Sequence, residues 1–194
     1  MPNLYIIAGP NGAGKTTASF TVLPELLDCR QFVNADEIAR GLSPFDVESV
    51  AFHAARIMLQ RIAELLNDGA DFAIETTLAT KTYRGLVQDA QQRGYSVTLV
   101  FFWLQSPELA IERVKLRVSE GGHNIPTDVI ERRFKRGINY LVRVFTYAVN
   151  KWVVFDNSFG QHERIASGTL GETPEIYNHE KWSAIHATAN EHTE

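Results

Sequence analysis

A chain of 194 residues is long enough to bury one sizeable hydrophobic core and too short for two comfortable ones. The hydrophobic share of 44% and the charged share of 22% are ordinary for a soluble globular domain. A net charge of -4 argues against nucleic acid as the main partner, and the single cysteine, Cys29, excludes an internal disulfide and a cysteine-rich zinc site.

The first residues contain no signal-like apolar stretch, and no run of the chain approaches the length of a membrane span. We therefore expect a cytoplasmic protein without a membrane partner. The six histidines are scattered without metal-ligand spacing, so no zinc site is predicted.

The predicted elements begin with a buried strand over residues 4–8 and a helix from Thr17 to Pro24. The loop between them has the Walker A spacing, Gly-x-x-x-x-Gly-Lys-Thr, in the strand, loop and helix order that this motif requires. The predicted nucleotide-binding residues are Gly9, Pro10, Asn11, Gly12, Ala13, Gly14, Lys15, Thr16 and Thr17.

The residue types of this loop suit a polyphosphate. Glycines let successive backbone N–H groups curl around the anion, and the following helix directs the positive end of its dipole at the same place. Lys15 is expected to reach the β- and γ-phosphates and the Thr16 hydroxyl to bind Mg²⁺.

Farther along, a second strand is predicted over residues 31–34, and apolar residues at about every fourth position then predict a helix that Gly69 ends. A third strand over residues 72–74 and a helix over residues 80–93 follow. The next strand, residues 97–104, is apolar almost throughout, as expected of a central strand covered on both faces.

Ser106 and the proline after it predict the start of a helix that runs to about Val118. Another helix is expected over residues 127–150, and a fifth strand over residues 152–155. A hairpin is predicted around residues 168–174, followed by a short last helix.

Five strands separated by helices predict an α/β three-layer sandwich with a mainly parallel sheet and helices on both faces. We assign residues 1–187 to one domain built around the phosphate-binding loop and residues 188–194 to a polar, frayed tail. The ligand crevice of such a sheet lies at the carboxyl ends of its strands, so polar residues there are candidates for chemistry.

Asp36 lies just beyond the second strand. A carboxylate there would face the end of the phosphate-binding loop, where it could take a proton from an acceptor hydroxyl or orient that hydroxyl. The alternative is that Asp36 only caps the next turn of the chain.

Glu75, Thr76 and Thr77 follow the third strand directly. Glu75 could hold the water shell of a metal ion or bind a substrate hydroxyl, and the sequence leaves both roles open. The two threonines could donate to a substrate or start the next helix. The segment 156–158, after the fifth strand, could line an adenine pocket or form a plain turn.

The segment 113–136 contains seven Lys or Arg residues against three Asp or Glu residues, in a chain that is acidic overall. We interpret it as a lid that brings arginines over the transferring phosphoryl group and excludes water, although a solvated basic face is the alternative. Arg117, which closes the first lid helix, is the first candidate for the site. The second arginine of the site is one of Arg132, Arg133 and Arg136, and we assign this role to Arg133.

Several of these motifs together resemble the zeta-toxin family of P-loop kinases, in particular its short single-domain bacterial members. The resemblance covers roughly residues 1–160. The motifs are Gly9 to Thr17, Asn34-x-Asp36, Glu75-Thr76-Thr77-Leu78, Arg113-Val114-x-x-Arg117, Gly121-Gly122-His123-x-x-Pro126 and Arg132-Arg133.

The resemblance implies a kinase-like core with sheet order 2-3-1-4-5, ATP with Mg²⁺ as the phosphoryl donor, and Asp36 as the general base. It also implies that Glu75 and Thr77 lie on the substrate side. In the toxins proper the acceptor is a sugar hydroxyl of UDP-N-acetylglucosamine, and an antitoxin protein is a candidate partner. The chain departs from the toxin pattern at Ala79 and His123, where that pattern has arginines.

Three functions are therefore open: a kinase that phosphorylates a hydroxyl of a small molecule, an ATPase or nucleotide-dependent switch that acts with a protein partner, and a toxin neutralised by a partner. The first requires Asp36 as base and an acceptor pocket between it and the loop. The third is compatible with the first.

Overall fold

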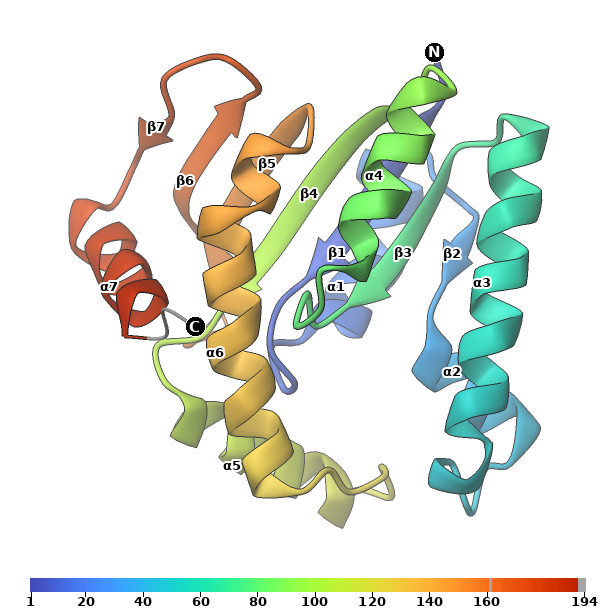
Figure 1. The fold of residues 1–194 in the computed structure, drawn as a ribbon. Coiled ribbons are helices and arrows are strands. Elements are labelled where there is room, and N and C mark those ends of the chain that lie inside the picture. Colours follow the sequence, from blue (N-terminus) through green and yellow to red (C-terminus); the bar gives the residue numbers. More distant parts are fainter. Residues whose placement is uncertain (161, 192–194) are drawn as a thin grey trace.

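The computed structural model describes residues 1–160 and 162–191, and over these residues the strands form one seven-stranded sheet in the order β2-β3-β1-β4-β5-β6-β7 (Figure 1). The pairs among β1 to β5 are parallel, whereas β6 pairs antiparallel with β5 and with β7. The strands are β1 (Asn3–Ala8), β2 (Phe32–Val33), β3 (Phe72–Thr76), β4 (Ser96–Trp103), β5 (Lys151–Asp156), β6 (Glu163–Thr169) and β7 (Glu175–Ile176).

The order 2-3-1-4-5 is confirmed for the parallel part of the sheet, but the expected strand count was too low. The predicted hairpin is present as β6 and β7, which pair antiparallel, but it also extends the sheet beyond β5. An additional antiparallel strand covers the hydrogen-bonding edge that β5 would otherwise expose. Gly168 permits this pairing, since a Cβ there would lie 2.7 Å from ring atoms of Trp152.

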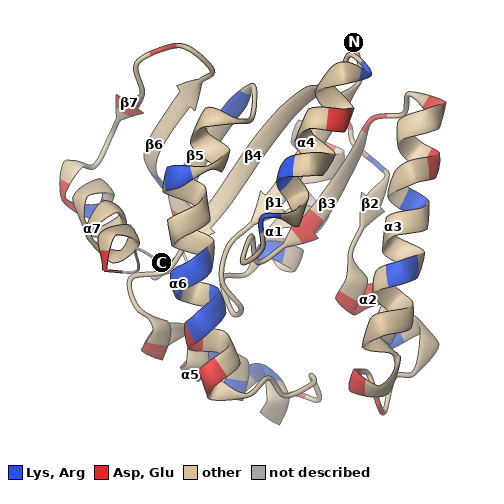
Figure 2. Cartoon of the chain, viewed as in Figure 1, with Lys and Arg blue, Asp and Glu red and all other residues tan. Residues whose placement is uncertain are grey.

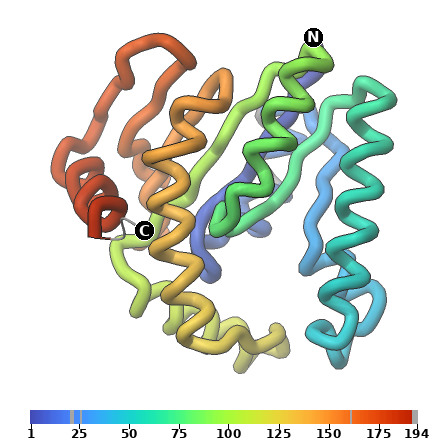
Figure 3. The backbone as a smooth tube through the Cα atoms, viewed as in Figure 1, coloured from blue at the N-terminus to red at the C-terminus, as the bar shows by residue number. Residues whose placement is uncertain are grey.

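Helices cover both faces of the sheet. Figure 1 shows α3, α4 and α6 on the near face and α1 on the far face, and the tube of Figure 3 shows the same arrangement. The helices are α1 (Lys15–Leu26), α2 (Ala35–Leu42), α3 (Ala51–Asp68), α4 (Thr82–Gln92), α5 (Pro107–Ser119), α6 (Thr127–Arg143) and α7 (His179–Asn190), with short 3₁₀ turns at Glu48–Val50 and Phe145–Tyr147. Among the helices described, none combines the length and apolar character needed to cross a membrane.

The core lies along the two central strands. Leu4 and Ile6 of β1 and Leu99 and Phe101 of β4 are fully buried. Because helices cover both faces of β4, the strand is apolar on both sides, as the sequence predicted. This packing holds the carboxyl ends of β1, β3 and β4 at one end of the sheet, where the loops that follow them meet.

Two predicted helix ends agree with the structure. Gly69 ends α3 in the left-handed conformation, with φ of 63°. The Ser106 hydroxyl accepts a hydrogen bond from the Leu109 amide and so caps α5.

Other predicted bounds differ. Helix α1 continues through Pro24 to Leu26, because a proline in the last turn removes only one backbone hydrogen bond. Helix α6 ends at Arg143 instead of about residue 150, and the chain then turns so that Phe145 is buried. Helix α7 reaches Asn190, so the expected start of the tail at residue 188 falls inside this helix, while residues 192–194 lie outside the described part.

Candidate active site

The phosphate-binding loop connects β1 to α1 at the carboxyl end of the sheet. Gly9, Gly12 and Gly14 have φ of 144°, 76° and 75°, which residues with a side chain rarely adopt. A Cβ at Gly9 would also lie 2.2 Å from the carbonyl oxygen of Phe102 on β4. Glycine therefore permits the backbone shape of the loop at all three positions and, at Gly9, its close packing against β4.

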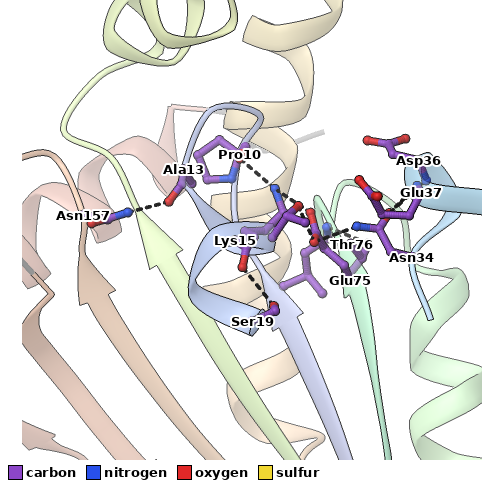
Figure 4. A network of polar contacts seen from close by, with 12 residues as sticks. Pro10, Ala13, Lys15, Ser19, Asn34, Asp36, Glu37, Glu75, Thr76 and Asn157 are labelled. Atoms are coloured by element: carbon purple, nitrogen blue, oxygen red, sulfur yellow. Dashed lines mark hydrogen bonds and ion pairs between the residues drawn. The ribbon is translucent and has the colours of Figure 1, made fainter. Parts of the chain in front are cut away.

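Two side chains from outside the loop hold it in place. The Asn157 Nδ2 donates to the Ala13 carbonyl at 2.7 Å (Figure 4), and the Arg113 Nη1 donates to the Gly12 carbonyl at 3.4 Å. The Arg113 Nη2 donates to the Ser158 carbonyl at 2.8 Å. The segment after β5, predicted to line an adenine pocket or to form a turn, thus braces the loop. The sequence did not reveal this role.

Lys15 is buried at the base of the loop, with 6% of its surface exposed. Its Nζ donates to the Pro10 carbonyl at 2.9 Å and lies 3.8 Å from the Glu75 Oε1. Burial lowers the pKa of Lys15, whereas the negative charges of Glu75 and Asp36 act in the opposite direction. The Lys15 amine thus lies inside the curl of the loop, where a phosphate would lie.

Glu75 joins the loop to the neighbouring strand ends. Its Oε2 accepts hydrogen bonds from the Thr16 hydroxyl and from the Asn34 Nδ2, both at 2.8 Å. Figure 4 shows the contact between Glu75 and Asn34. Burial raises the pKa of Glu75, and the nearby Lys15 lowers it. The contact with Thr16 puts this carboxylate beside the hydroxyl that the motif assigns to the metal ion.

Asn34, and not Asp36, caps the following helix. The Asn34 Oδ1 accepts from the amides of Asp36 and Glu37 at 2.8 and 3.4 Å, so the capping role considered for Asp36 belongs to its neighbour. The helix itself, α2, was not predicted, because it is only eight residues long and contains Gly41, a poor helix former. The sequence does contain a signal for the start of α2, because Asn34 is closely followed by the acids Asp36 and Glu37.

Two cavities meet at Asp36 and Arg133. One, of about 220 Å³, lies next to the loop and is lined by Asn11, Lys15, Asn34, Ala35, Asp36, Met58, Glu75, Thr76, Thr77, Thr80, Tyr83 and Arg133. The other, of about 260 Å³, extends under the connection between α5 and α6 and includes His123, Ile125 and Pro126 among its lining residues. Asp36 and Arg133 line both cavities.

The lid arginines separate into two groups. Arg133 faces the cavities, whereas Arg132 and Arg136 line a different hollow on α6. The Arg117 Nη2 donates to the His123 carbonyl at 3.3 Å, and its Nε has no hydrogen-bond partner among the described residues. The charges of Arg117 and Arg133 both act to lower the pKa of Lys15, so both guanidinium groups lie within electrostatic reach of the loop.

Thr76, the last residue of β3, and Thr77 do not start the next helix, which begins at Thr82. The Thr76 hydroxyl accepts from the Leu78 amide at 3.0 Å and supports a turn in which Leu78 has φ of 58°. Thr77 lines the smaller cavity together with Tyr83, whose pKa is raised by burial. Tyr83 was not predicted as a site residue, because a tyrosine within a helical pattern usually packs against the core.

His123, which stands where the toxin pattern has an arginine, lines the larger cavity. Burial lowers its pKa, and the charge of Asp36 opposes this effect. No group of three or more His, Cys, Asp or Glu residues that could hold a metal ion occurs in the described part of the chain. The Thr16 hydroxyl and the Glu75 carboxylate are oxygen donors that suit Mg²⁺, which keeps several waters and needs few protein ligands.

Comparison with known proteins identifies the family of the chain. The family model described as Zeta toxin matches residues 1–159. An uncharacterised protein of Haemophilus influenzae is 28% identical over 128 residues, which are 65% of this chain and 88% of that protein.

The fold is similar to those of several solved structures. AvrRxo1-ORF1, in its complex with AvrRxo1-ORF2 and sulphate ions, superposes with a TM-score of 0.79 at 18% identity; the match covers 100% of this chain and 65% of that one. The complex with ATP gives 0.77 at 19% identity, again over 65% of that chain. The structure described for the PezAT toxin-antitoxin system of Streptococcus pneumoniae gives 0.65 at 18% identity, over 98% of this chain and 87% of the other.

The likeness extends to a metabolic kinase. A gluconokinase from Sinorhizobium meliloti superposes with a TM-score of 0.50 at 14% identity, over 98% of this chain and 92% of that enzyme. At these identities the superpositions establish a shared P-loop kinase fold. Because the chain spans less than two thirds of the AvrRxo1-ORF1 length, that protein also contains material with no counterpart here.

Proposed function

Because this chain belongs to the Zeta toxin family, we propose that it is a kinase that transfers the γ-phosphate of ATP to a hydroxyl group of a small molecule. The observation that carries the proposal is the small cavity beside the loop. This cavity is lined by a phosphate-binding cation, Lys15, by a carboxylate, Asp36, and by a lid arginine, Arg133. These are the groups that phosphoryl transfer needs within reach of one another.

The loop residues would bind the nucleotide. The glycine backbone lets amide groups surround the phosphates, and Lys15 would exchange its contact with the Pro10 carbonyl for the β- and γ-oxygens. Thr16 and Glu75 would hold Mg²⁺, directly or through water, and the bound ion would offset charge on the phosphates. An ATP-bound relative with the same fold supports this assignment.

Asp36 would act as general base. Its side chain is exposed to the cavity and not used as a cap, so it is available to an acceptor hydroxyl. As the hydroxyl oxygen attacks the γ-phosphorus, its proton passes to the Asp36 carboxylate and the bond to the β–γ bridging oxygen breaks. Arg117 and Arg133 would neutralise the transferring group, and closure of the lid, residues 113–136, would exclude water.

The acceptor would occupy the cavity beside the loop and extend into the larger one. Polar side chains line the first, among them Glu75 and Thr77, which suits a molecule with several hydroxyl groups. A nucleotide sugar such as UDP-N-acetylglucosamine is the candidate that the family suggests. The replacement of two arginines of the toxin pattern by Ala79 and His123 makes a different acceptor equally worth testing.

A protein partner is part of the proposal, since the relatives with this fold include a toxin-antitoxin system and a two-protein complex. An antitoxin would act by covering the nucleotide or acceptor cavity. The need for ATP would place the reaction in the cytoplasm.

The test is ATP consumption by the purified protein with Mg²⁺, measured with and without a panel of nucleotide sugars and small alcohols. New phosphoesters would be detected by phosphorus NMR and mass spectrometry. We expect turnover that depends on an acceptor and is lost in Lys15→Ala. Acceptor-independent release of phosphate by the parent protein would instead show an ATPase, and unchanged nucleotide binding by Lys15→Ala would reject the loop assignment.

A further inference from the structure

A second charged hollow lies on α6, outside the cavities described above. It has a volume of about 450 Å³ and is lined by Lys81, Arg132, Lys135, Arg136, Asn139, Tyr140, Arg143 and Val144. Five of these residues are cations and none is an acid, in a chain whose net charge is -4. In Figure 2, blue segments recur along α6 and occur again at the start of α4.

Unlike four other surface cations, the cations of this hollow have no carboxylate in salt-bridge contact among the described residues. Arg40, Arg61, Arg93 and Lys181 each form a salt bridge with a nearby carboxylate. Within residues 1–160 and 162–191, none of the five cations of the hollow takes part in a salt bridge. Like charges gathered without counter-charges repel one another, and an anion that binds among them removes this repulsion.

Two of the cations are held in position. The Lys81 Nζ lies 5.7 Å from the ring centre of Tyr140, a cation–π contact. The Arg143 Nη2 donates to the Asn190 Oδ1 on α7 at 3.0 Å. The remaining cations follow one another on a single face of α6, because residues three or four apart on a helix are neighbours.

We propose that this hollow is a second anion site that binds a small molecule carrying several phosphate charges, distinct from the nucleotide site. Arginine guanidinium groups match phosphate oxygens with paired hydrogen bonds, and three arginines line the hollow. The volume lies within the range of small-molecule sites, and the aromatic ring of Tyr140 offers a surface for the uncharged part of the ligand. Binding itself does not depend on the kinase proposal.

The hollow is lined by the same two segments as the proposed acceptor cavity, the segment after β3 and helix α6. Lys81 follows Thr80 of that cavity directly in the chain, and Arg132 precedes Arg133. An anion that links Lys81 to the α6 arginines would therefore hold the segment after β3 against α6. We expect such a ligand to fix the relative position of the two segments that line the acceptor cavity.

The test uses inorganic tripolyphosphate as the probe and isothermal titration calorimetry as the measurement. A Lys15→Ala background weakens binding at the nucleotide loop, so that the remaining heat reports the second site. In this background we expect saturable binding that weakens with added salt. Adding Arg132→Gln and Arg136→Gln should lower the affinity about tenfold or more, the scale of lost charge-assisted hydrogen bonds.

The matched control replaces Arg30 and Arg56, two exposed arginines elsewhere, with glutamine. It changes the net charge equally, so it should leave the affinity within about twofold. Lys81→Gln alone should also weaken binding, which tests the contribution of the segment after β3. Equal losses in the control and test pairs, or no binding once Lys15 is replaced, would overturn the proposal. Tighter binding of a polyglutamate peptide than of tripolyphosphate would replace it with an acidic protein partner.

Discussion

Two buried groups of opposite charge, Lys15 and Glu75, lie 3.8 Å apart at the base of the phosphate-binding loop. Taking both charges out of water costs free energy that their mutual attraction only partly returns. Burial accordingly lowers the pKa of Lys15 and raises that of Glu75, and each shift disfavours the charged form. A pair of this kind is expected at a functional site, where stability is given up for an arrangement that receives a charged ligand.

The raised pKa of Glu75 has a measurable consequence for stability. The folded protein binds this proton more tightly than the unfolded chain, so the free energy of unfolding falls as pH rises from the ordinary glutamate value of 4.5 through the raised value. Glu75→Gln removes that loss. The substitution also removes a negative charge that raises the pKa of Lys15. The lower pKa of Lys15 likewise makes the variant gain stability relative to the parent as pH rises.

We therefore expect the stability of Glu75→Gln relative to the parent to increase as pH rises above the ordinary glutamate value of 4.5 and through the raised pKa of Glu75. Urea unfolding at a series of pH values measures it. Glu112→Gln, at an exposed position of α5, is the matched control and should show a flat difference. A flat difference for Glu75→Gln as well would mean that the carboxyl is not perturbed by burial.

Asp36 gives a second prediction at this scale. Asp36→Asn keeps the shape of the side chain but removes the proposed base, so kcat should fall about 100-fold or more while ATP affinity is retained. Rapid-quench measurement of phosphoryl transfer and equilibrium nucleotide binding separate the two effects.

Glu37→Gln is the control for Asp36→Asn. Glu37 is the next residue in the first turn of α2, and its salt bridge with Arg40 lies at the surface, where such pairs contribute little. Its kcat should stay within about threefold of the parent. Equal rates for Asp36→Asn and the parent would remove Asp36 from the chemistry.

At the scale of elements, the segment that follows β3 is pressed against α6. A Cβ at Gly137 of α6 would lie 2.6 Å from the Thr77 carbonyl oxygen, which belongs to the backbone and cannot move aside cheaply. Glycine is therefore required for the close approach, although it is a poor helix former. This contact sets the position of Thr77 relative to Arg133, one turn earlier on the same helix.

Gly137→Ala should destabilise the protein by about 1–3 kcal/mol, the usual cost of overpacking, and should raise KM for the acceptor because Thr77 is displaced. Gly85→Ala on α4 is the matched control. Nothing lies within 4 Å of the added Cβ there, so the better helix propensity of alanine should stabilise the protein by about 0.5–1 kcal/mol. Denaturant unfolding measures both, and a stabilised Gly137→Ala would contradict the packing argument.

At the scale of the whole molecule, the parallel part of the sheet and its antiparallel extension have different roles. The parallel strands end at the loop, at α2 and near the connection between α5 and α6, whereas the antiparallel extension by β6 and β7 lies beside α7, which contacts β5 and, through Lys181 and Glu163, β6. The indole rings of Trp152 and Trp182 stack with centres 5.5 Å apart, and the Lys181 Nζ contacts the Asp156 carboxylate at 2.7 Å. The second part should therefore behave as a passive support.

Hydrogen exchange read by mass spectrometry should show this division. ATP with Mg²⁺ and an acceptor should slow exchange in the loop, residues 9–17, and in the connection between α5 and α6, residues 120–126, because these segments would close over the ligands. Exchange in the β6–β7 connection, residues 170–174, should stay the same and serves as the internal control. Uniform protection across all three segments would indicate global stabilisation without a lid.

The sequence alone determined the phosphate-binding loop, the parallel core and two of the helix ends. Each of these depends on residues close together in the chain: the glycine spacing before Lys15, the apolar run of β4, and the caps at Gly69 and Ser106. Local conformational preference is sufficient for such features, because hydrogen bonds and steric limits within a few residues decide them.

Only the tertiary structure decided which distant residues share the site. It separated Arg133 from Arg132 and Arg136, joined Glu75 to Thr16 and Asn34, and made Asn157 a brace of the loop. Adjacent arginines have the same chemistry and differ only in the direction in which their helix presents them. That direction depends on how α6 packs against the segment after β3, a contact between residues about 60 positions apart that no local pattern encodes.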